Sequence, residues 1–314
     1  MIRGNRARLR INYGTSCRFR CLCGGYHVSC GSDAKDGRNH FRKIVCTWPG
    51  WKGIQSGRCR GKTRRGSIFY QPVGEDDFAQ MAMQTWKAAN VTPKVITDAS
   101  SYTGAAYIFV DDKKGDNAII IAPGAAAQFS KDDIAQNARL IAGADVFMTQ
   151  LEQPIEVAKI GLEVARNSGK ITILNPAPAL ALERDVFGLC DFITPNETEA
   201  EALTGVTVKT SKDAENAAEA LVYLGVKTPV ITMGEQGVYL HGYGVIPAFN
   251  FGPVVETTGA GDAFNGGFAT ALSEGKSPEE AVRFGCATAS ISVTRAGTAH
   301  AMPTREEVEK LLGS

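Results

Sequence analysis

The 314-residue sequence lacks any long apolar run, and its first 72 residues are nearly devoid of acidic side chains. No stretch approaches the roughly 18 consecutive apolar residues of a membrane-spanning helix, and the start of the chain has no apolar segment typical of a secretory signal. We therefore expect a soluble, cytoplasmic protein without a membrane partner. The apolar content of 44% suffices for a sizeable core, which excludes a wholly disordered chain.

Residues 1–72 differ from the rest of the chain in charge and pattern. They hold 16 Lys and Arg against two acids, Asp33 and Asp36, whereas the later residues are net acidic. They show no apolar periodicity of a helix or strand, so they predict no core. Six of the eight cysteines lie here: Cys17, Cys21, Cys23, Cys30, Cys46 and Cys59.

Three interpretations of this basic, Cys-rich segment are open. Four of its cysteines and His27 could form a zinc module, but their spacing matches no paired C-x2-C arrangement. The segment could instead be an Arg-rich targeting peptide or an arm that binds nucleic acid. We favour the third interpretation, translation in the wrong reading frame. Read one base later with permitted synonymous codons, Asp33 to Gln71 contains G-G-K-x-x-N-Q and then an alanine-rich helix.

From Val73 to Ser314, short apolar runs alternate with helical stretches. This alternation predicts an α/β fold, in which helices cover both faces of a parallel sheet. The expected strands span residues 106–110, 118–122, 146–150, 171–175, 192–194, 229–233 and 237–241. The expected helices span residues 78–89, 131–142, 154–168, 197–204, 211–224, 261–274 and 278–293.

A glycine-rich motif, E-T-T-G-A-G-D at residues 256–262, opens one of these helices. The backbone N–H groups of Gly259, Ala260 and Gly261 can gather around an anion at a helix N-terminus, where the dipole favours phosphate. A carboxylate at the end of such a loop can accept a hydroxyl proton in phosphoryl transfer, so Asp262 is the candidate base. For this loop alone, the alternative is a glycine-rich turn in which the Asp262 carboxylate only interacts favourably with the dipole of the helix.

Several motifs, in the same order, resemble those of the ribokinase (PfkB) family. Residues 73–78 resemble V-G-D-D-x-F, residues 175–179 match N-P-A-P-A, residues 196–201 contain N-x-x-E, and residues 256–262 resemble D-T-x-G-A-G-D. The resemblance implies a ribokinase-like, doubly wound, mostly parallel sheet with a small β lid. Since the family's first strand and sugar loop would fall in residues 1–72, we expect that segment to be unfolded and the later domain to lack both, with an incomplete lid.

The resemblance also implies sites for ATP and Mg2+. Asn196 and Glu199 of the N-x-x-E motif would act through water on the magnesium of the triphosphate, an ion that needs few protein ligands. The T-M-G-E-Q-G stretch resembles the family's nucleotide loop, and Cys286 stands in the helix that flanks the adenine pocket, where we expect it to pack. The implied nucleotide-loop residues are Thr232, Gly234, Gln236 and Gly237.

A potassium site is implied near the C-terminus, because S-V-T-R-A-G at residues 292–297 resembles the family's V-T-R-x-G. Glu256 stands where the family has Asp, and Ala301 where a ribokinase often has Ser. The residues that would surround the ion, mostly through backbone carbonyls, are Glu256, Thr258, Ser292, Arg295, Gly297 and Ala301.

The function implied is ATP-dependent phosphorylation of D-ribose at its 5-hydroxyl, with Glu152 of the Q-L-E segment and Asp262 contacting the sugar. Without its sugar loop, the chain as it stands would not phosphorylate ribose. One alternative is another PfkB-family kinase, acting on fructose or 2-keto-3-deoxygluconate. A second is a non-catalytic nucleotide-binding protein whose basic arm binds nucleic acid, a partner we do not expect. Pairing into a homodimer through the lid is open.

Overall fold

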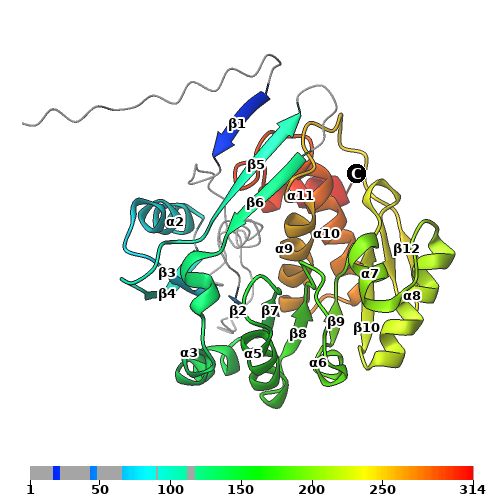
Figure 1. The fold of residues 1–314 in the computed structure, drawn as a ribbon. Helices are drawn as coiled ribbons and strands as arrows, with labels where there is room; N and C mark the ends of the chain where they lie inside the picture. Colours follow the sequence, from blue (N-terminus) through cyan, green and yellow to red (C-terminus); the bar gives the residue numbers. More distant parts are fainter. Residues whose placement is uncertain (1–16, 22–42, 48–65, 90, 112–116, 314) are drawn as a thin grey trace, which may run out of the picture.

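The structure, a computed structural model, describes residues 17–21, 43–47, 66–89, 91–111 and 117–313. Its centre is a nine-stranded sheet with the strand order β12-β11-β10-β9-β8-β7-β2-β3-β4 (Figure 1). All neighbours from β4 to β10 are parallel, and β11 and β12 complete one edge as antiparallel strands. This confirms the predicted α/β class with a mostly parallel sheet.

The strands of the large sheet from β7 to β12 have two to five residues, whereas β3 and β4 have eight and seven. From β7 to β11 each lies within the range expected from the sequence or differs from it by one residue. Their bounds are β2 Lys43–Thr47, β3 Gly66–Val73, β4 Val91–Thr97, β7 Val146–Thr149, β8 Ile171–Leu174, β9 Phe192–Ile193, β10 Thr228–Thr232, β11 Val238–Leu240 and β12 Gly244–Ile246.

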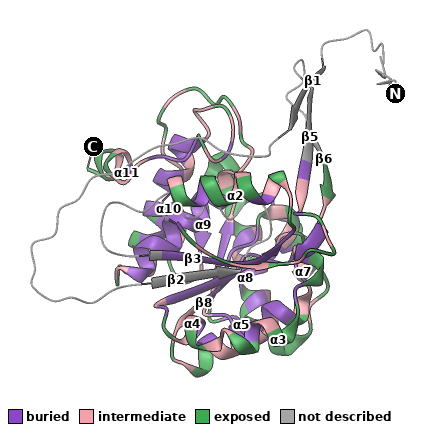
Figure 2. Ribbon diagram, turned by 90° about the vertical axis from the view of Figure 1, so that its left-hand side faces the viewer, coloured by how far each residue is buried: buried purple, intermediate pink, exposed green. Residues whose placement is uncertain are grey.

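Helices cover both faces of the sheet, with α2, α9 and α10 on one side and α3 to α8 on the other (Figure 2). No helix of the described residues is both long and apolar enough to cross a membrane. The helices are α2 Asp77–Ala88, α3 Lys131–Gln136, α4 Ala138–Ala142, α5 Ile155–Asn167, α6 Arg184–Gly188, α7 Glu197–Thr204, α8 Ser211–Leu224, α9 Ala260–Ser273, α10 Pro278–Ser292 and α11 Arg305–Leu312, with the 3-10 turns η1 Gly124–Gln128 and η2 Gly234–Gln236.

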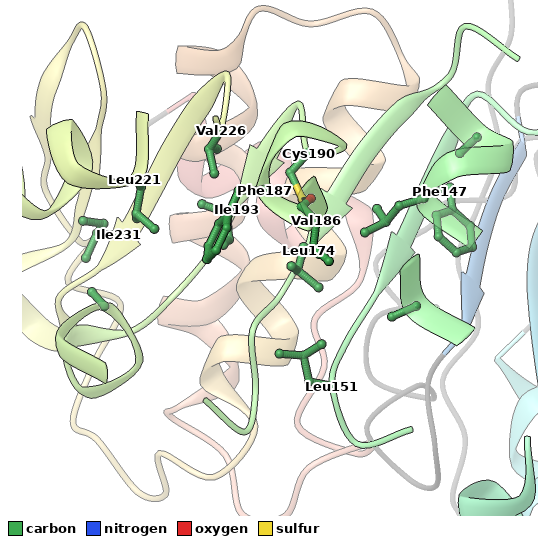
Figure 3. Packing of buried hydrophobic residues seen from close by; sticks show 14 of the residues in the cluster. Phe147, Leu151, Leu174, Val186, Phe187, Cys190, Ile193, Leu221, Val226 and Ile231 are labelled. Carbon is green, nitrogen blue, oxygen red and sulfur yellow. The ribbon is translucent and has the colours of Figure 1, made fainter. Parts of the chain in front are cut away.

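Successive strand residues alternate between two apolar cores, as the period of a strand requires. In β7, Val146 and Met148 pack in the core beneath α9 and α10, whereas Phe147 packs against α5. In β8, Ile173 packs in the core beneath α9 and α10, and Leu174 packs in the core on the other face. Figure 3 shows the second core, in which side chains of the strands meet those of α6 and α8. Both sheet faces are therefore buried, which explains the continuous apolar runs in the sequence.

Two strands of the large sheet come from the segment that we expected to be unfolded. β2 lies between β7 and β3 and pairs with both in parallel, and β3 ends at Val73. The large sheet therefore includes strands from before Val73, where we expected it to lack one. The predicted sugar loop and His27 of the zinc alternative lie outside the described residues.

A second, smaller sheet consists of three antiparallel strands in the order β1-β5-β6, with bounds β1 Cys17–Cys21, β5 Ala105–Asp111 and β6 Asn117–Ala122. It projects from the α/β body beside the carboxyl-terminal ends of the strands (Figure 1). β5 and β6 were predicted from the sequence, and β1 adds a third strand from the basic segment.

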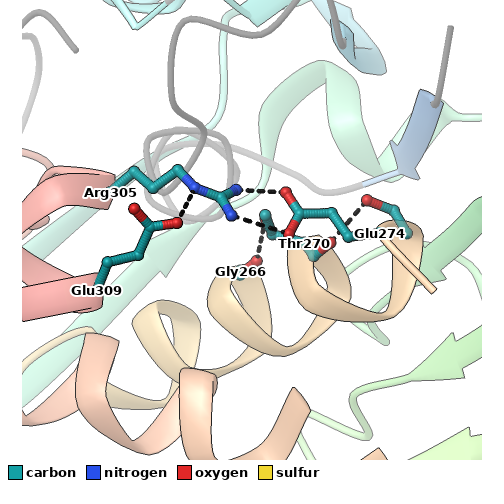
Figure 4. Close-up of polar contacts among 6 residues, drawn as sticks. Gly266, Thr270, Glu274, Arg305 and Glu309 are labelled. Carbon is teal, nitrogen blue, oxygen red and sulfur yellow. Dashed lines mark hydrogen bonds and ion pairs between the residues drawn. The ribbon is translucent and has the colours of Figure 1, made fainter. Parts of the chain in front are cut away.

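The last helix, α11, is fastened to α9 by a charged cluster (Figure 4). The guanidinium of Arg305 donates to both carboxylate oxygens of Glu274 and to Oε1 of Glu309, and it lies 5.7 Å from the centre of the Phe284 ring. The side chains of Arg305 and Glu274 are largely buried. A bidentate, shielded pair of this kind holds the chain end in place more firmly than exposed ion pairs do.

The close approach of α9 and α10 depends on glycine at position 267. A Cβ built there would lie 2.5 Å from Oγ1 of Thr288 and 3.1 Å from Cα of Gly285. We expect Gly267→Ala to lower the free energy of unfolding by about 1–3 kcal/mol, because the two helices must separate. Urea denaturation measures this. Gly188→Ala is the control, since a Cβ at Gly188 meets nothing within 4 Å; an equal loss in both variants would contradict the packing argument.

Candidate active site

A cavity of about 240 Å³ opens at the carboxyl-terminal ends of β7, β8, β9 and β10. Ligands of open α/β sheets bind at this edge, beyond the ends of the strands. Its walls come from the strand ends and from the start of α9. The lining residues are Gln150, Asn175, Ala177, Thr194, Asn196, Glu199, Thr232, Thr257, Thr258, Gly259, Ala260, Gly261, Asp262 and Asn265.

The N-terminus of α9 faces this cavity with its backbone. Gly259 is the N-cap residue, in a left-handed conformation with φ of 82°, and it makes no side-chain cap to the first turn. The first N–H groups of a helix have no partner within the helix, and the dipole there is positive. The loop therefore has the arrangement predicted from the sequence for binding an anion such as phosphate.

Asp262 lies in the first turn of α9 and lines the cavity, with only 7% of its surface exposed. Its Oδ1 lies 3.5 Å from Nε2 of Gln150, a long contact. Hydrogen bonds of catalytic groups often shorten only when substrate is present. A shielded carboxylate next to backbone donors can accept a proton from a hydroxyl whose oxygen attacks a bound phosphate.

Asn196 and Glu199 line the same cavity as Asp262, where α7 begins. They form a capping box: the Asn196 side chain accepts from the Glu199 N–H at 2.8 Å, and Oε2 of Glu199 accepts from the Asn196 N–H at 2.9 Å. A parallel bridge joins Asn196 to Thr232. The Glu199 carboxylate is thus held at the cavity wall, and oxygen donors of this kind suit Mg2+.

Of the other predicted nucleotide residues, Thr232 ends β10 and lines the cavity, whereas Gly234, Gln236 and Gly237 lie in the turn between β10 and β11, outside the lining. Gly234 and Gly237 have φ of 52° and 95°, which side chains rarely adopt. The N–H of Met233 donates across the turn to the carbonyl of Gly237 at 2.8 Å, and Nε2 of Gln236 donates to the carbonyl of Lys209. The glycines are thus required by the turn itself.

The predicted potassium residues meet beside the start of α9. The N–H of Gly297 donates to Oε2 of Glu256 at 2.7 Å, and the carbonyl of Val293 accepts from the N–H groups of both Val255 and Glu256. Arg295 instead pairs with Glu307 at 2.5 Å. The structure thus brings residues 255–256 into contact with Val293 and Gly297. Ser292 and Ala301 are buried, and Thr258 lines the cavity.

Cys286 and Glu152 do not line the cavity. Cys286 is packed in the core of α9 and α10, and burial raises the pKa of its thiol to about 12. Such a thiol stays protonated and is not a nucleophile. Glu152 is half-buried, two residues beyond Gln150.

Six cavity residues were given no role in the sequence analysis: Gln150, Asn175, Ala177, Thr194, Thr257 and Asn265. Gln150, Asn175 and Thr194 each follow the last residue of a strand, and Asn265 lies one turn beyond Gly261 in α9. Gln150 and Asn175 stand inside motifs that the sequence analysis used. The signal that could have found them is their position, because polar side chains directly after buried parallel strands gather at one edge of the sheet.

The fold and the cavity define an α/β phosphotransferase, in which a helix N-terminus and a buried carboxylate face one cavity at the edge of a parallel sheet. Residues 67–305 match the family model described as pfkB family carbohydrate kinase. The chain belongs to this family of carbohydrate kinases.

Curated and solved relatives agree with this assignment. The chain is 37% identical over 267 residues to a ribokinase of Haemophilus influenzae, covering 84% of this chain and 87% of the relative. The crystal structure of a Thermotoga maritima ribokinase covers 88% of this chain and all of its own at a TM-score of 0.74 and 33% identity. The structure of Arabidopsis thaliana ribokinase complexed with ribose and ATP covers 87% of this chain and 99% of its own at a TM-score of 0.78 and 26% identity.

Proposed function

We propose that this carbohydrate kinase transfers the γ-phosphoryl group of ATP to the 5-hydroxyl of D-ribose. The observation that carries the proposal is the buried Asp262 carboxylate, placed at the end of a loop of backbone N–H groups at the start of α9. Ribokinase relatives with 37% and 33% identity support ribose as the acceptor.

In this reaction Asp262 accepts the proton of the attacking hydroxyl while a new bond forms between the sugar oxygen and phosphorus. The bond between that phosphorus and the bridging oxygen of ADP breaks. The N–H groups of Gly259, Ala260 and Gly261 stabilise the charge on the transferring group, and most of the acceleration comes from this stabilisation and from positioning.

A panel of acceptors tests the proposed function. ADP formation is measured with ribose, fructose and 2-keto-3-deoxygluconate at equal concentrations, and the product is identified by mass spectrometry. We expect ribose to give the highest kcat/KM and a product phosphorylated at position 5. A higher kcat/KM with another sugar would favour a different kinase of the family. The absence of turnover with every sugar, together with salt-sensitive binding to nucleic acid, would favour the non-catalytic alternative.

Magnesium would be held at Glu199, and the capping box provides a sharp test. Glu199→Gln keeps an oxygen that can accept from the Asn196 N–H but removes the negative charge. We expect the Mg2+ concentration for half-maximal rate to rise about tenfold. Glu280→Gln is the matched control, since Glu280 forms the same box with Ser277 on the start of α10. An unchanged Mg2+ dependence in Glu199→Gln would contradict this role.

Potassium activation is proposed from the junction of Glu256 with residues 292–297, where carbonyl and carboxylate oxygens gather. We expect a several-fold higher rate in potassium chloride than in tetramethylammonium chloride at equal ionic strength. Glu256→Asp, which restores the residue of the family pattern, should increase the activation. Equal rates in both salts would contradict the proposal.

Although β2 and most of β3 come from residues 1–72, this segment is proposed to be translated in the wrong frame, ahead of a kinase domain from residue 73. The G-G-K-x-x-N-Q sequence in the shifted frame and the excess of cations over acids before residue 73 support this. The nucleotide sequence of the locus tests it. A shifted frame without stop codons should encode that loop, and the restored chain should have a higher kcat with ribose. Stop codons in that frame would show that residues 1–72 belong to the protein.

The protein is proposed to act in the cytoplasm and to pair through its small sheet. The outer strand β6 exposes Ile120 and Ile121, each by more than half of its surface. Such an apolar edge suits a second copy of the chain. Light scattering coupled to size-exclusion chromatography would reveal a dimer, which Ile121→Lys should dissociate.

A further inference from the structure

A ring of hydrogen bonds lies beside the proposed catalytic loop, and every link except the last, to the Asp262 carboxylate, joins uncharged groups. In α9, Nδ2 of Asn265 donates to the carbonyl of Gly261 at 3.0 Å, and Oγ1 of Thr194 donates to Oδ1 of Asn265 at 2.7 Å. Nδ2 of Asn175 donates to the carbonyl of Thr194 at 2.9 Å. The ring therefore starts at the residue before Asp262 and crosses to the ends of β9 and β8.

Gln150, after β7, closes this ring. Its Nε2 donates to Oδ1 of Asn175 at 2.6 Å and lies 3.5 Å from Oδ1 of Asp262. Only 1% of the Gln150 surface is exposed. Three strand ends and the first turn of α9 are thus joined through side chains that belong to no charged pair. The donors of such a buried chain, each paired with a neighbouring acceptor, favour one geometry of its members.

The orientation of each amide in the ring is determined by its neighbours. The Asn175 amide must present its oxygen to Gln150, because its nitrogen donates to the carbonyl of Thr194. Gln150 must then present its nitrogen toward Asn175 and Asp262, both of which offer oxygens. Its Oε1 therefore points away from them and is buried without a hydrogen-bond partner among the described residues.

A buried acceptor without a donor costs about 1–3 kcal/mol, so proteins rarely retain one without a use. Oε1 itself has almost no accessible surface, but Gln150 lines the same cavity as Asp262, so a hydroxyl bound there can supply the donor once a small shift of the wall exposes Oε1. Asp262 cannot supply it as an ionised base, since a carboxylate only accepts. The nitrogen of the Gln150 amide is therefore suited to hold Asp262, and its oxygen is suited to accept from a hydroxyl of the substrate.

We propose that Gln150 is a positioning residue, whose nitrogen holds the Asp262 carboxylate through the ring and whose Oε1 accepts a hydrogen bond from the sugar. This inference rests on the proposed function, in which Asp262 is the base. A base and its phosphate loop must be held within a fraction of an ångström, because a displacement of about 1 Å can cost about 100-fold in rate.

Two variants separate the two tasks of Gln150. Gln150→Met keeps the shape but removes both the donor and the acceptor, whereas Thr194→Val removes only the donor to Asn265. We expect Gln150→Met to lower kcat about 100-fold and to raise KM for ribose, with KM for ATP within about twofold of the original. Thr194→Val should lower kcat about tenfold and leave KM for ribose unchanged.

Thr172→Val is the matched control. Thr172 is fully buried in β8, and its hydroxyl donates to the carbonyl of Leu189 at 2.7 Å, away from the cavity lining. We expect it to lower the melting temperature as much as Thr194→Val does and to leave kcat unchanged. Thermal denaturation of all variants is measured beside the kinetics.

The double variant Gln150→Met/Thr194→Val decides whether the ring acts as one unit. We expect its kcat to be close to that of Gln150→Met alone. Gln150→Met already interrupts the ring, so the loss of a second hydrogen bond in the same ring should have little further effect. Loss of stability with unchanged kcat in Gln150→Met, or fold-changes in kcat that multiply in the double variant, would overturn the positioning role. An unchanged KM for ribose would overturn the role of Oε1. Absence of turnover with ribose both in the unaltered chain and in the chain with its reading frame restored would overturn the proposed function itself.

Discussion

Replacing Asp262 with Asn is expected to lower kcat by on the order of 10³-fold, because the amide cannot accept the hydroxyl proton. The side chain keeps its size, and the buried position in α9 tolerates a neutral group, so the melting temperature should change little. The measurement is the rate of ribose-dependent ADP formation, compared with the affinity for ATP by calorimetry. Since Asp262 acts on the sugar hydroxyl, the affinity for ATP should be retained.

Asp185→Asn serves as the control for this experiment. Asp185 is an exposed carboxylate at the start of α6 that pairs with Lys159 on the surface. Surface ion pairs contribute little, so the rate and the stability should remain close to those of the original chain. Asp262→Asn with a kcat within tenfold of the original would show that another group takes the proton.

Gly237→Ala should have the largest effect on stability, a loss of at least about 3 kcal/mol of unfolding free energy. Gly237 has φ of 95°, and a Cβ there would lie 2.2 Å from the carbonyl oxygen of Ile246. The side chain therefore meets both an unfavourable backbone conformation and the backbone of β12. Urea denaturation measures the loss, and KM for ATP should rise because the turn between β10 and β11 must move.

Gly242→Ala separates the cost of the left-handed backbone conformation from the cost of the contact with Ile246. Gly242 lies in the turn after β11 with φ of 85°, but a Cβ there meets nothing within 4 Å. We expect a loss of about 1–2 kcal/mol, the cost of the left-handed conformation alone. Equal losses at the two positions would show that the contact with Ile246 is relieved by a small backbone shift.

Local patterns predicted the elements that carry their own start and stop signals. Helix α8 has the predicted bounds, because Thr210 and Asp213 form a capping box and Gly225 ends the helix. The predicted helix 131–142 is instead two helices, α3 and α4, that meet at Asn137. There Nδ2 of Asn137 donates to the hydroxyl of Tyr70, a residue 67 positions earlier. No local pattern contains that contact.

Strand β4 was missed because Pro93 interrupts its pattern. The strand lies at the edge of the sheet, where a missing N–H is tolerated. β2 and β3 were missed because residues before Val73 show no apolar period. β2 pairs with β7, which is distant in the sequence, and β3 pairs with β2 and β4.

The candidate site likewise has parts that the sequence predicts and parts that it does not. The loop before Asp262 and the N-x-x-E motif could be found from the sequence, since each is a short run whose chemistry is local. The ring through Gln150, Asn175, Thr194 and Asn265 could not, because it joins residues up to 115 positions apart. Only the alignment of the strand ends places those side chains within hydrogen-bond distance.

The central position of β2 has a consequence for shortened versions of the chain. β2 pairs on one side with β7 and on the other with β3, through residues Lys43–Thr47. A protein that began at Gly66 would lose no residue of the cavity but would divide the large sheet into two parts. Each part would present a bare parallel edge, and such edges recruit other chains. Truncation there would therefore yield aggregates instead of a smaller soluble kinase.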